Sequence, residues 1–141
     1  MTGFFDDLED CEQLLCYIDP RDKDPRNEEK RQLAFLRMVK MLCPAVTVFA
    51  VPNGAKRSQW EANKARREGV KSGAPDLVCC WNRGVAFVEM KAGTTMPSPT
   101  QVAFLNTLYR QGQWVGVFRQ EQSAIDWLTS IGAPSIRRAA K

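Results

Sequence analysis

The sequence predicts a single α/β domain whose central strands are covered by helices on both sides. Three observations predict this class. The 141 residues suit one domain with an adequate core. Segments with apolar residues at helical spacing alternate with short apolar, β-branched runs, in the order helix, strand, helix, strand, strand, helix, strand, helix. Proline, glycine and capping residues separate these segments.

Residues 1–26 are predicted to form an acidic helical arm ahead of this domain. Its apolar residues fall at helical spacing and predict a short amphipathic helix that ends at Asp19-Pro20. These residues are Phe4, Phe5, Leu8, Cys11, Leu15 and Ile18. Residues 1–29 contain 10 of the 16 acidic and 3 of the 20 basic residues, so the remainder carries a balance of +11, which favours a polyanionic partner. The arm packs on the body or on a second subunit, or it occupies a basic groove as a nucleic-acid mimic.

The domain is predicted to begin with a helix and a buried strand. Asn27 is a good N-cap, and Glu28 and Glu29 suit the positive end of a helix that runs to about Leu42. Residues 45–51 are rich in β-branched residues and predict the strand. Either glutamate is explained as a helix-start acid; alternatively, one of them is a third carboxylate that reaches a neighbouring metal site.

A second helix carries a cluster of basic residues. Ser58 and Glu61 form an S-x-x-E capping box, and Gly69 ends the helix. The basic residues in and around it are Lys56, Arg57, Lys64, Arg66, Arg67 and Lys71. Such a cluster suits backbone phosphates, although most charge runs are solvated helix faces. We favour phosphate contact because the cluster directly precedes an acidic hairpin.

Residues 73–91 predict this hairpin, with an acid at its mouth. Two apolar runs flank the turn signal Asn82-Arg83-Gly84. Asp76 precedes the first run, and Glu89 and Lys91 end the second and point to one face. Residues paired across a hairpin share a face, so a three-residue loop would put Asp76 on the wrong side. Convergence therefore requires an even-numbered loop, a bulge, or strands that have splayed at Asp76.

The three charged side chains at the hairpin mouth suggest metal-assisted chemistry. Two carboxylates suit Mg²⁺ or Mn²⁺, and Lys91 is suited to orienting an attacking water or stabilising charge on phosphorus. The alternative is a pair of strand-end charges or a Glu89–Lys91 ion pair. We favour a site because Glu89 lies between Val88 and Met90, where burying an unpaired charge costs about several kcal/mol.

The remaining segments predict a helix, a strand, a closing helix and a basic tail. Ser98 and Pro99 begin the helix and Gly112 ends it. Gln101 either completes a capping box or directs its amide to the catalytic face. The segments that follow are residues 114–118 (strand), 121–130 (helix) and 132–141 (tail).

Composition excludes several classes of function. The chain has no histidine, so mechanisms that need a histidine base are excluded. Its five cysteines are odd in number and show no CxxC spacing, which argues against a zinc site. No apolar run is long enough to cross a membrane and no signal peptide is visible, so we expect an intracellular, cytoplasmic protein.

Together these motifs resemble the VRR-NUC family, a branch of the PD-(D/E)xK nuclease superfamily. The matching segments are Asn53-Gly54, Lys56-Arg57, Glu68 to Leu77, Glu89-Met90-Lys91, Ser98-x-x-Gln101 and Gly112. Any one motif is weak, but the combination is specific and covers about residues 27–130. The resemblance implies a nuclease domain over 27–131, with a restriction-endonuclease-like mixed sheet flanked by helices and Mg²⁺ or Mn²⁺ at the hairpin mouth.

The resemblance also implies roles for individual residues. The positions that match the family's metal-binding acids, catalytic lysine and motif glutamine are Asp76, Glu89, Lys91 and Gln101. The carbonyl of Met90 would be a further metal ligand. An acid of the first helix belongs to the pattern, and Glu28 matches it better than Glu29 does.

Small stand-alone members look like virus- or phage-type enzymes that resemble Holliday-junction resolvases and pair as homodimers, and this chain is of that size. We therefore expect a metal-dependent endodeoxyribonuclease that acts on branched or junction DNA in repair or replication. One alternative is a DNA-binding accessory protein that uses the same basic face without cleavage. Another is an accessory protein whose acidic arm binds a protein partner.

Overall fold

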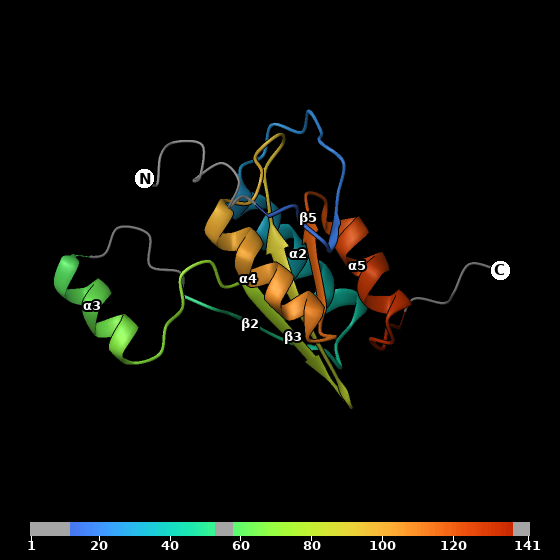
Figure 1. The fold of residues 1–141 in the computed structure, drawn as a ribbon. Coiled ribbons are helices and arrows are strands. Elements are labelled where there is room, and N and C mark those ends of the chain that lie inside the picture. The colour runs from blue at the N-terminus through green and yellow to red at the C-terminus, as the bar shows by residue number, and fades with distance from the viewer. Residues whose placement is uncertain (1–11, 53–57, 137–141) are drawn as a thin grey trace.

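The computed structural model describes residues 12–52 and 58–136 (Figure 1). Its centre is a mixed five-stranded sheet in the order β1-β5-β4-β3-β2. The elements are β1 (Tyr17–Ile18), α2 (Glu28–Leu42), β2 (Thr47–Ala50), α3 (Gln59–Arg67), β3 (Leu77–Trp81), β4 (Gly84–Met90), α4 (Pro99–Arg110), β5 (Trp114–Phe118) and α5 (Glu121–Ser130). The predicted fold class and the predicted order of helices and strands from residue 27 onward are confirmed, and β1 is an additional strand.

Local capping explains where three of the helices begin. The side chains of Asn27, Ser58 and Ser98 accept hydrogen bonds from backbone N–H groups in the first turns of α2, α3 and α4. Each cap accepts from a backbone N–H that the helix itself leaves unpaired, so the position of the capping residue in the sequence predicts where the helix begins. Within the described ranges, no helix has the length and apolar character that crossing a membrane requires.

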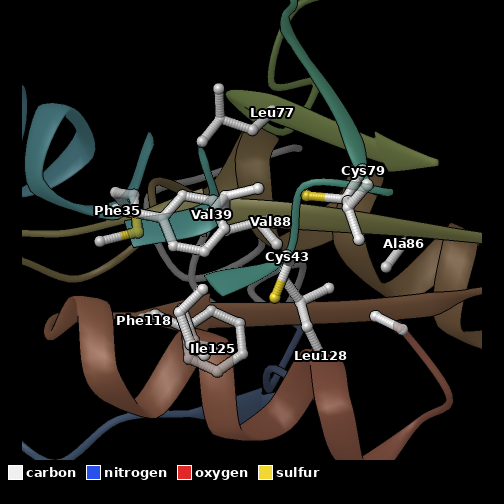
Figure 2. Packing of buried hydrophobic residues seen from close by; sticks show 14 residues of the cluster. Phe35, Val39, Cys43, Leu77, Cys79, Ala86, Val88, Phe118, Ile125 and Leu128 are labelled. Atoms are coloured by element: carbon white, nitrogen blue, oxygen red, sulfur yellow. The ribbon is translucent and has the colours of Figure 1, made fainter. Parts of the chain in front are cut away.

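The larger core lies between the sheet and helices α2 and α5. Phe35 and Val39 of α2 and Ile125 and Leu128 of α5 meet side chains from β3, β4 and β5, as Figure 2 shows. Burying a side chain of this size contributes about 1.5–3 kcal/mol. This packing fixes α2, and therefore the residues at its N-terminus, against the centre of the sheet.

The other face of the sheet packs against α4. Leu105 of α4 contacts Val115 and Val117 of β5 in a second, smaller core cluster. Strand β4 supplies both faces, because its successive side chains alternate. Val88 and Met90 join the larger core, so the residue between them points to the α4 face.

The N-terminal segment corrects one prediction. Leu15 and Ile18 were assigned to a helix, but Tyr17–Ile18 is a strand that pairs in parallel with Gly116 and Val117 of β5. Burial around it alternates, with Cys16 buried and its two neighbours exposed. The apolar residues of this segment alternate in burial as in a strand, but their spacing also fits a helix, so the sequence did not distinguish the two. The earlier part of the predicted helix, up to Cys11, lies outside the described residues.

Acidic residues that follow β1 are bound to arginines of the body. Asp22 accepts hydrogen bonds of 2.9 Å from both terminal nitrogens of the fully buried Arg31. This pairing lowers the pKa of Asp22 to about 2. Asp24 pairs with Arg26 at 2.7 Å, and the backbone N–H of Arg119 donates to the carboxylate of Asp19 at 2.7 Å. Residues 17–26 are thus built into the domain, and their acids do not occupy the basic cluster of α3.

Replacing Gly73 by alanine should destabilise the fold more than the same change at Gly112. Both glycines have positive φ, +81° and +78°, so both variants carry the left-handed backbone cost of about 1–2 kcal/mol. Only at Gly73 would the new Cβ lie 2.6 Å from a backbone oxygen, that of Thr100 in α4; at Gly112 it meets nothing within 4 Å. Urea unfolding of both variants measures the difference. Equal losses would contradict the tight packing of this loop on α4.

Candidate active site at the end of the central hairpin

The hairpin register brings Asp76 and Glu89 to the same face. Trp81 pairs with Gly84, so the loop holds two residues, Asn82 and Arg83, and Arg83 adopts a φ of 67°. The pairing continues to Leu77 opposite Val88. Asp76 and Glu89 are the next residues on their strands and therefore face the α4 side together. Of the three predicted arrangements that would allow convergence, the structure shows the even-numbered loop.

Glu89 is a buried carboxyl that the protein only partly satisfies. Its side chain is 1% exposed, and among the described residues its Oε1 is buried without a hydrogen-bond partner. The pKa of Glu89 is raised to about 9, mainly by burial, with contributions from the hydrogen bond and the negative charge of Asp76. Lys91 opposes this shift and Glu28 adds to it. Two ionised carboxylates this close repel each other, so a bound proton or cation is needed to offset their charge.

Asp76 is held at the entrance to β3 by backbone contacts. Its Oδ2 accepts a hydrogen bond of 3.3 Å from the N–H of Met90, which is the residue after Glu89. Its own carbonyl accepts from the N–H of Val51 at 2.8 Å, which ties it to the end of β2. Asp76 is half-buried, so its carboxylate lies between the interior and solvent.

Lys91 and Glu28 form the other half of the site. The backbone N–H of Lys91 donates to the carbonyl of Phe118 at 2.8 Å, so its main chain continues the pairing with β5. Its side chain is buried, and Nζ lies 3.7 Å from Oε1 of Glu28. Glu28 begins α2 and is half-buried, whereas the neighbouring Glu29 is exposed. Of the two predicted glutamates, the structure brings Glu28 to the site.

The donor set fits a hard divalent cation. Asp76 and Glu89 offer carboxylate oxygens on one face, and the unpartnered Oε1 of Glu89 is a buried acceptor that a cation would satisfy. Within residues 12–52 and 58–136, no three His, Cys, Asp or Glu side chains are grouped to hold an ion together. The direct contact of Glu28 is with Lys91, and metal ligation by Glu28 and by the carbonyl of Met90 remains a prediction.

Gln101 completes a helix cap. Its Oε1 accepts from the N–H of Ser98 at 2.8 Å, and Ser98 Oγ accepts from the N–H of Gln101 at 3.2 Å. This is the first of the two predicted alternatives. The first turn of α4 also packs against Gly73, three residues before Asp76, so Gln101 lies beside the loop that leads to the site. A catalytic role for its amide stays a prediction.

The basic residues of α3 lie apart from the sheet. Figure 1 shows α3 projecting from the connection between β2 and β3. Lys64, Arg66, Arg67 and Lys71 are all exposed, with Lys64 3.7 Å from Glu68. Lys56 and Arg57 lie outside the described residues. The four described residues of the predicted cluster are therefore available to solvent, and they follow β2 at the same end of the sheet as Asp76.

Arg119 is a site-supporting residue that sequence reasoning missed. It is 1% exposed, and its Nη1 donates to the carbonyls of Ala92 and Thr95, each at 2.8 Å. It thereby holds the turn that follows Lys91. The available signal is its place directly after a buried strand, where a charged residue needs partners inside the protein.

This fold and site define a mixed α/β domain with a carboxylate and lysine centre at the end of its central hairpin. The sequence model described as the VRR-NUC domain matches residues 18–121, so the chain belongs to the VRR-NUC domain family. Membership implies a nuclease-type function with DNA as the bound partner. The match begins within the segment predicted as a separate arm, in agreement with the position of β1 in the sheet.

A solved structure described as a VRR_NUC domain protein is similar to this chain in fold. The two share 21% sequence identity and a TM-score of 0.58, over 77% of this chain and 89% of the other. No curated protein matches the chain.

The replacement Glu89→Gln should stabilise the ion-free protein at high pH. Because burial raises the pKa of Glu89, the folded protein binds its proton more tightly than the unfolded chain does. The contribution of Glu89 to wild-type stability is therefore fully present below about 4.5 and is lost as the pH rises toward about 9, whereas glutamine carries no charge to bury. Thermal unfolding in EDTA across this pH range measures this: the melting temperature of the variant relative to that of the wild type should rise with pH.

Divalent ions should favour the wild type over Glu89→Gln in stability. Mg²⁺ or Mn²⁺ that binds the folded state raises the melting temperature by mass action, and more in the wild type than in Glu89→Gln. Glu61→Gln, on the exposed face of α3, is the matched control and should follow the wild type. A Glu89 variant with wild-type pH dependence would contradict the buried-charge account.

Proposed function

We propose that this protein is a metal-dependent endodeoxyribonuclease of the PD-(D/E)xK type that hydrolyses phosphodiester bonds in branched or junction DNA. The observation that carries the proposal is the convergence of Asp76, Glu89 and Lys91 at one end of the sheet. Membership of the VRR-NUC family supports the nuclease class. The buried, unpartnered oxygen of Glu89 supports the need for a cation.

Each side chain has a distinct task in this mechanism. Asp76 and Glu89 would hold Mg²⁺ or Mn²⁺, with the carbonyl of Met90 and the carboxylate of Glu28 as further candidate ligands. When bound, such an ion makes hydroxide available from water near neutral pH and offsets charge on the scissile phosphate. The chain contains no histidine, so the acid and base work falls to these groups and to water.

Lys91 is placed to act on the reacting phosphate. Its ion pair with Glu28 and its burial restrict the ammonium to a position close to Glu89. From there it donates hydrogen bonds to the attacking water or to a non-bridging phosphate oxygen, where negative charge grows in the transition state. Gln101, beside the same loop, is proposed to orient the water or the lysine.

Recognition is proposed to follow DNA shape more than sequence. The exposed basic residues of α3 suit phosphates, which carry no base information. The resemblance to small stand-alone relatives supports a branched substrate and a homodimer. A cleavage panel of junctions, flaps, nicks and single strands, together with a sizing run, tests both features; equal cleavage of plain duplex would remove the structural selectivity.

The variant Lys91→Ala should lose cleavage while it keeps DNA binding. Removing one donor that stabilises transition-state charge typically costs about 100- to 1,000-fold in rate. Cleavage with Mg²⁺ or Mn²⁺ and binding in EDTA are measured on the same branched DNA. Lys40→Ala, at the exposed end of α2, is the control and should retain both.

Two results would contradict the proposed site. Cleavage that persists in both Asp76→Ala and Lys91→Ala would place the chemistry elsewhere. DNA binding without cleavage under any divalent ion would favour the non-catalytic DNA-binding alternative, for which the exposed basic cluster of α3 is the supporting observation.

A further inference from the structure

Trp60 is a large aromatic side chain left in solvent. It lies in the first turn of α3 and is 66% exposed. Ala65 is the buried residue of that helix, so the core needs little from α3. Burial of an indole ring is strongly favourable, and tryptophan is enriched at interfaces, where its ring is covered and its N–H finds a hydrogen-bond partner.

The surroundings of Trp60 indicate what it binds. The ammonium of Lys64 lies 5.7 Å from the centroid of its ring, and Arg66, Arg67 and Lys71 are exposed around the same helix. The exposed carboxylate of Glu68 is paired with Lys64. An aromatic ring among exposed cations that outnumber the two exposed carboxylates, Glu61 and Glu68, complements a single strand of nucleic acid, which offers base faces and phosphates together.

The connection that carries this helix joins the sheet at the same end as the candidate site. Ala50, the last residue of β2, pairs with Leu77, the first residue of β3, and α3 lies in the connection between them. That connection therefore leaves and re-enters the sheet at the end where Asp76 stands. Its second half is fixed, because Gly73 packs against the backbone of α4.

We propose that Trp60 is a stacking platform for an unpaired nucleobase of the DNA substrate. The base lies on the indole, and the basic residues of α3 bind the phosphates on either side of it. This inference rests on the proposed function and deepens it, because it requires a substrate with at least one unpaired nucleotide near the cleaved bond. The duplex arm of the same substrate gains nothing from Trp60.

Equilibrium binding of two probes in EDTA tests this. One is a duplex with a short single-stranded overhang, and the other is the same duplex fully paired. Trp60→Ala should weaken binding of the overhang probe by roughly 5- to 150-fold, the range for losing one stacked base, and change binding of the paired probe less than about twofold. Trp60→Phe keeps a stacking face and should recover part of the affinity.

Trp114→Ala is the matched control. Trp114 is 52% exposed, and it pairs with Ala86 near the turn of the hairpin, at the opposite end of the sheet from Asp76. It should bind both probes as the wild type does. A 2-aminopurine in the overhang gives an independent reading, because stacking quenches its fluorescence. The quench should persist in Trp114→Ala and disappear in Trp60→Ala.

Three outcomes would overturn the inference. An equal loss of affinity for both probes in Trp60→Ala would show a general effect on α3. Unchanged affinity for both would show that Trp60 does not contact the DNA. A change in oligomeric state on sizing would assign Trp60 to a contact between copies of the chain. Cleavage is scored separately: selective binding through Trp60 without any cleavage would retain the stacking platform and reject the nuclease.

Discussion

The pairing of the central hairpin is the constraint on which the rest of this site depends. Two residues in the turn, and not three, set Leu77 opposite Val88 and carry Asp76 to the face of Glu89. A shift of one residue would send one of the two carboxylates into the core between the sheet and α2. The same alternation that buries Val88 and Met90 in that core therefore directs Glu89 to the α4 face, where it is also buried.

A second constraint fastens the surroundings of the hairpin. The carbonyl of Arg119 accepts from Arg31, and Arg31 also donates to Asp22, so α2, the residue after β5 and the segment after β1 meet in one partly buried cluster. Burying such charges gains little net stability, but removing one partner is costly. The cluster lies where the N-terminus of α2 and the turn after Lys91 must be held, so it fixes the relative positions of Glu28 and Lys91.

Much of the fold could be predicted because its signals are local. Asn27, Ser58 and Ser98 act within one helical turn, and the hairpin turn acts between adjacent strands. The convergence of Asp76 with Glu89 could be predicted only as a condition on the hairpin: an even-numbered loop, a bulge, or strands that splay at Asp76. For Gln101 the sequence could not decide, because a capping box and a catalytic amide require the same residue at the same place.

The unpredicted features involve partners far apart in the chain. Strand β1 is two residues long and exists through its pairing with β5, about a hundred positions later, so no local pattern specifies it. Arg119 and its partner Asp19 are separated by the same stretch. A buried arginine is hard to foresee in a sequence, because composition assigns it to the surface until its acceptors are known.

Gly73 packs closely on α4 at a point of the chain between α3 and Asp76. On one side of that contact lies the projecting helix α3, and on the other lies Asp76. Because Gly73 is packed between them, a tilt of α3 would be resisted at this contact before it reached Asp76 from the C-terminal side of the helix. The C-terminal side of α3 is thus anchored independently of the hairpin, whereas its N-terminal side leads back to Val51, whose N–H binds the carbonyl of Asp76.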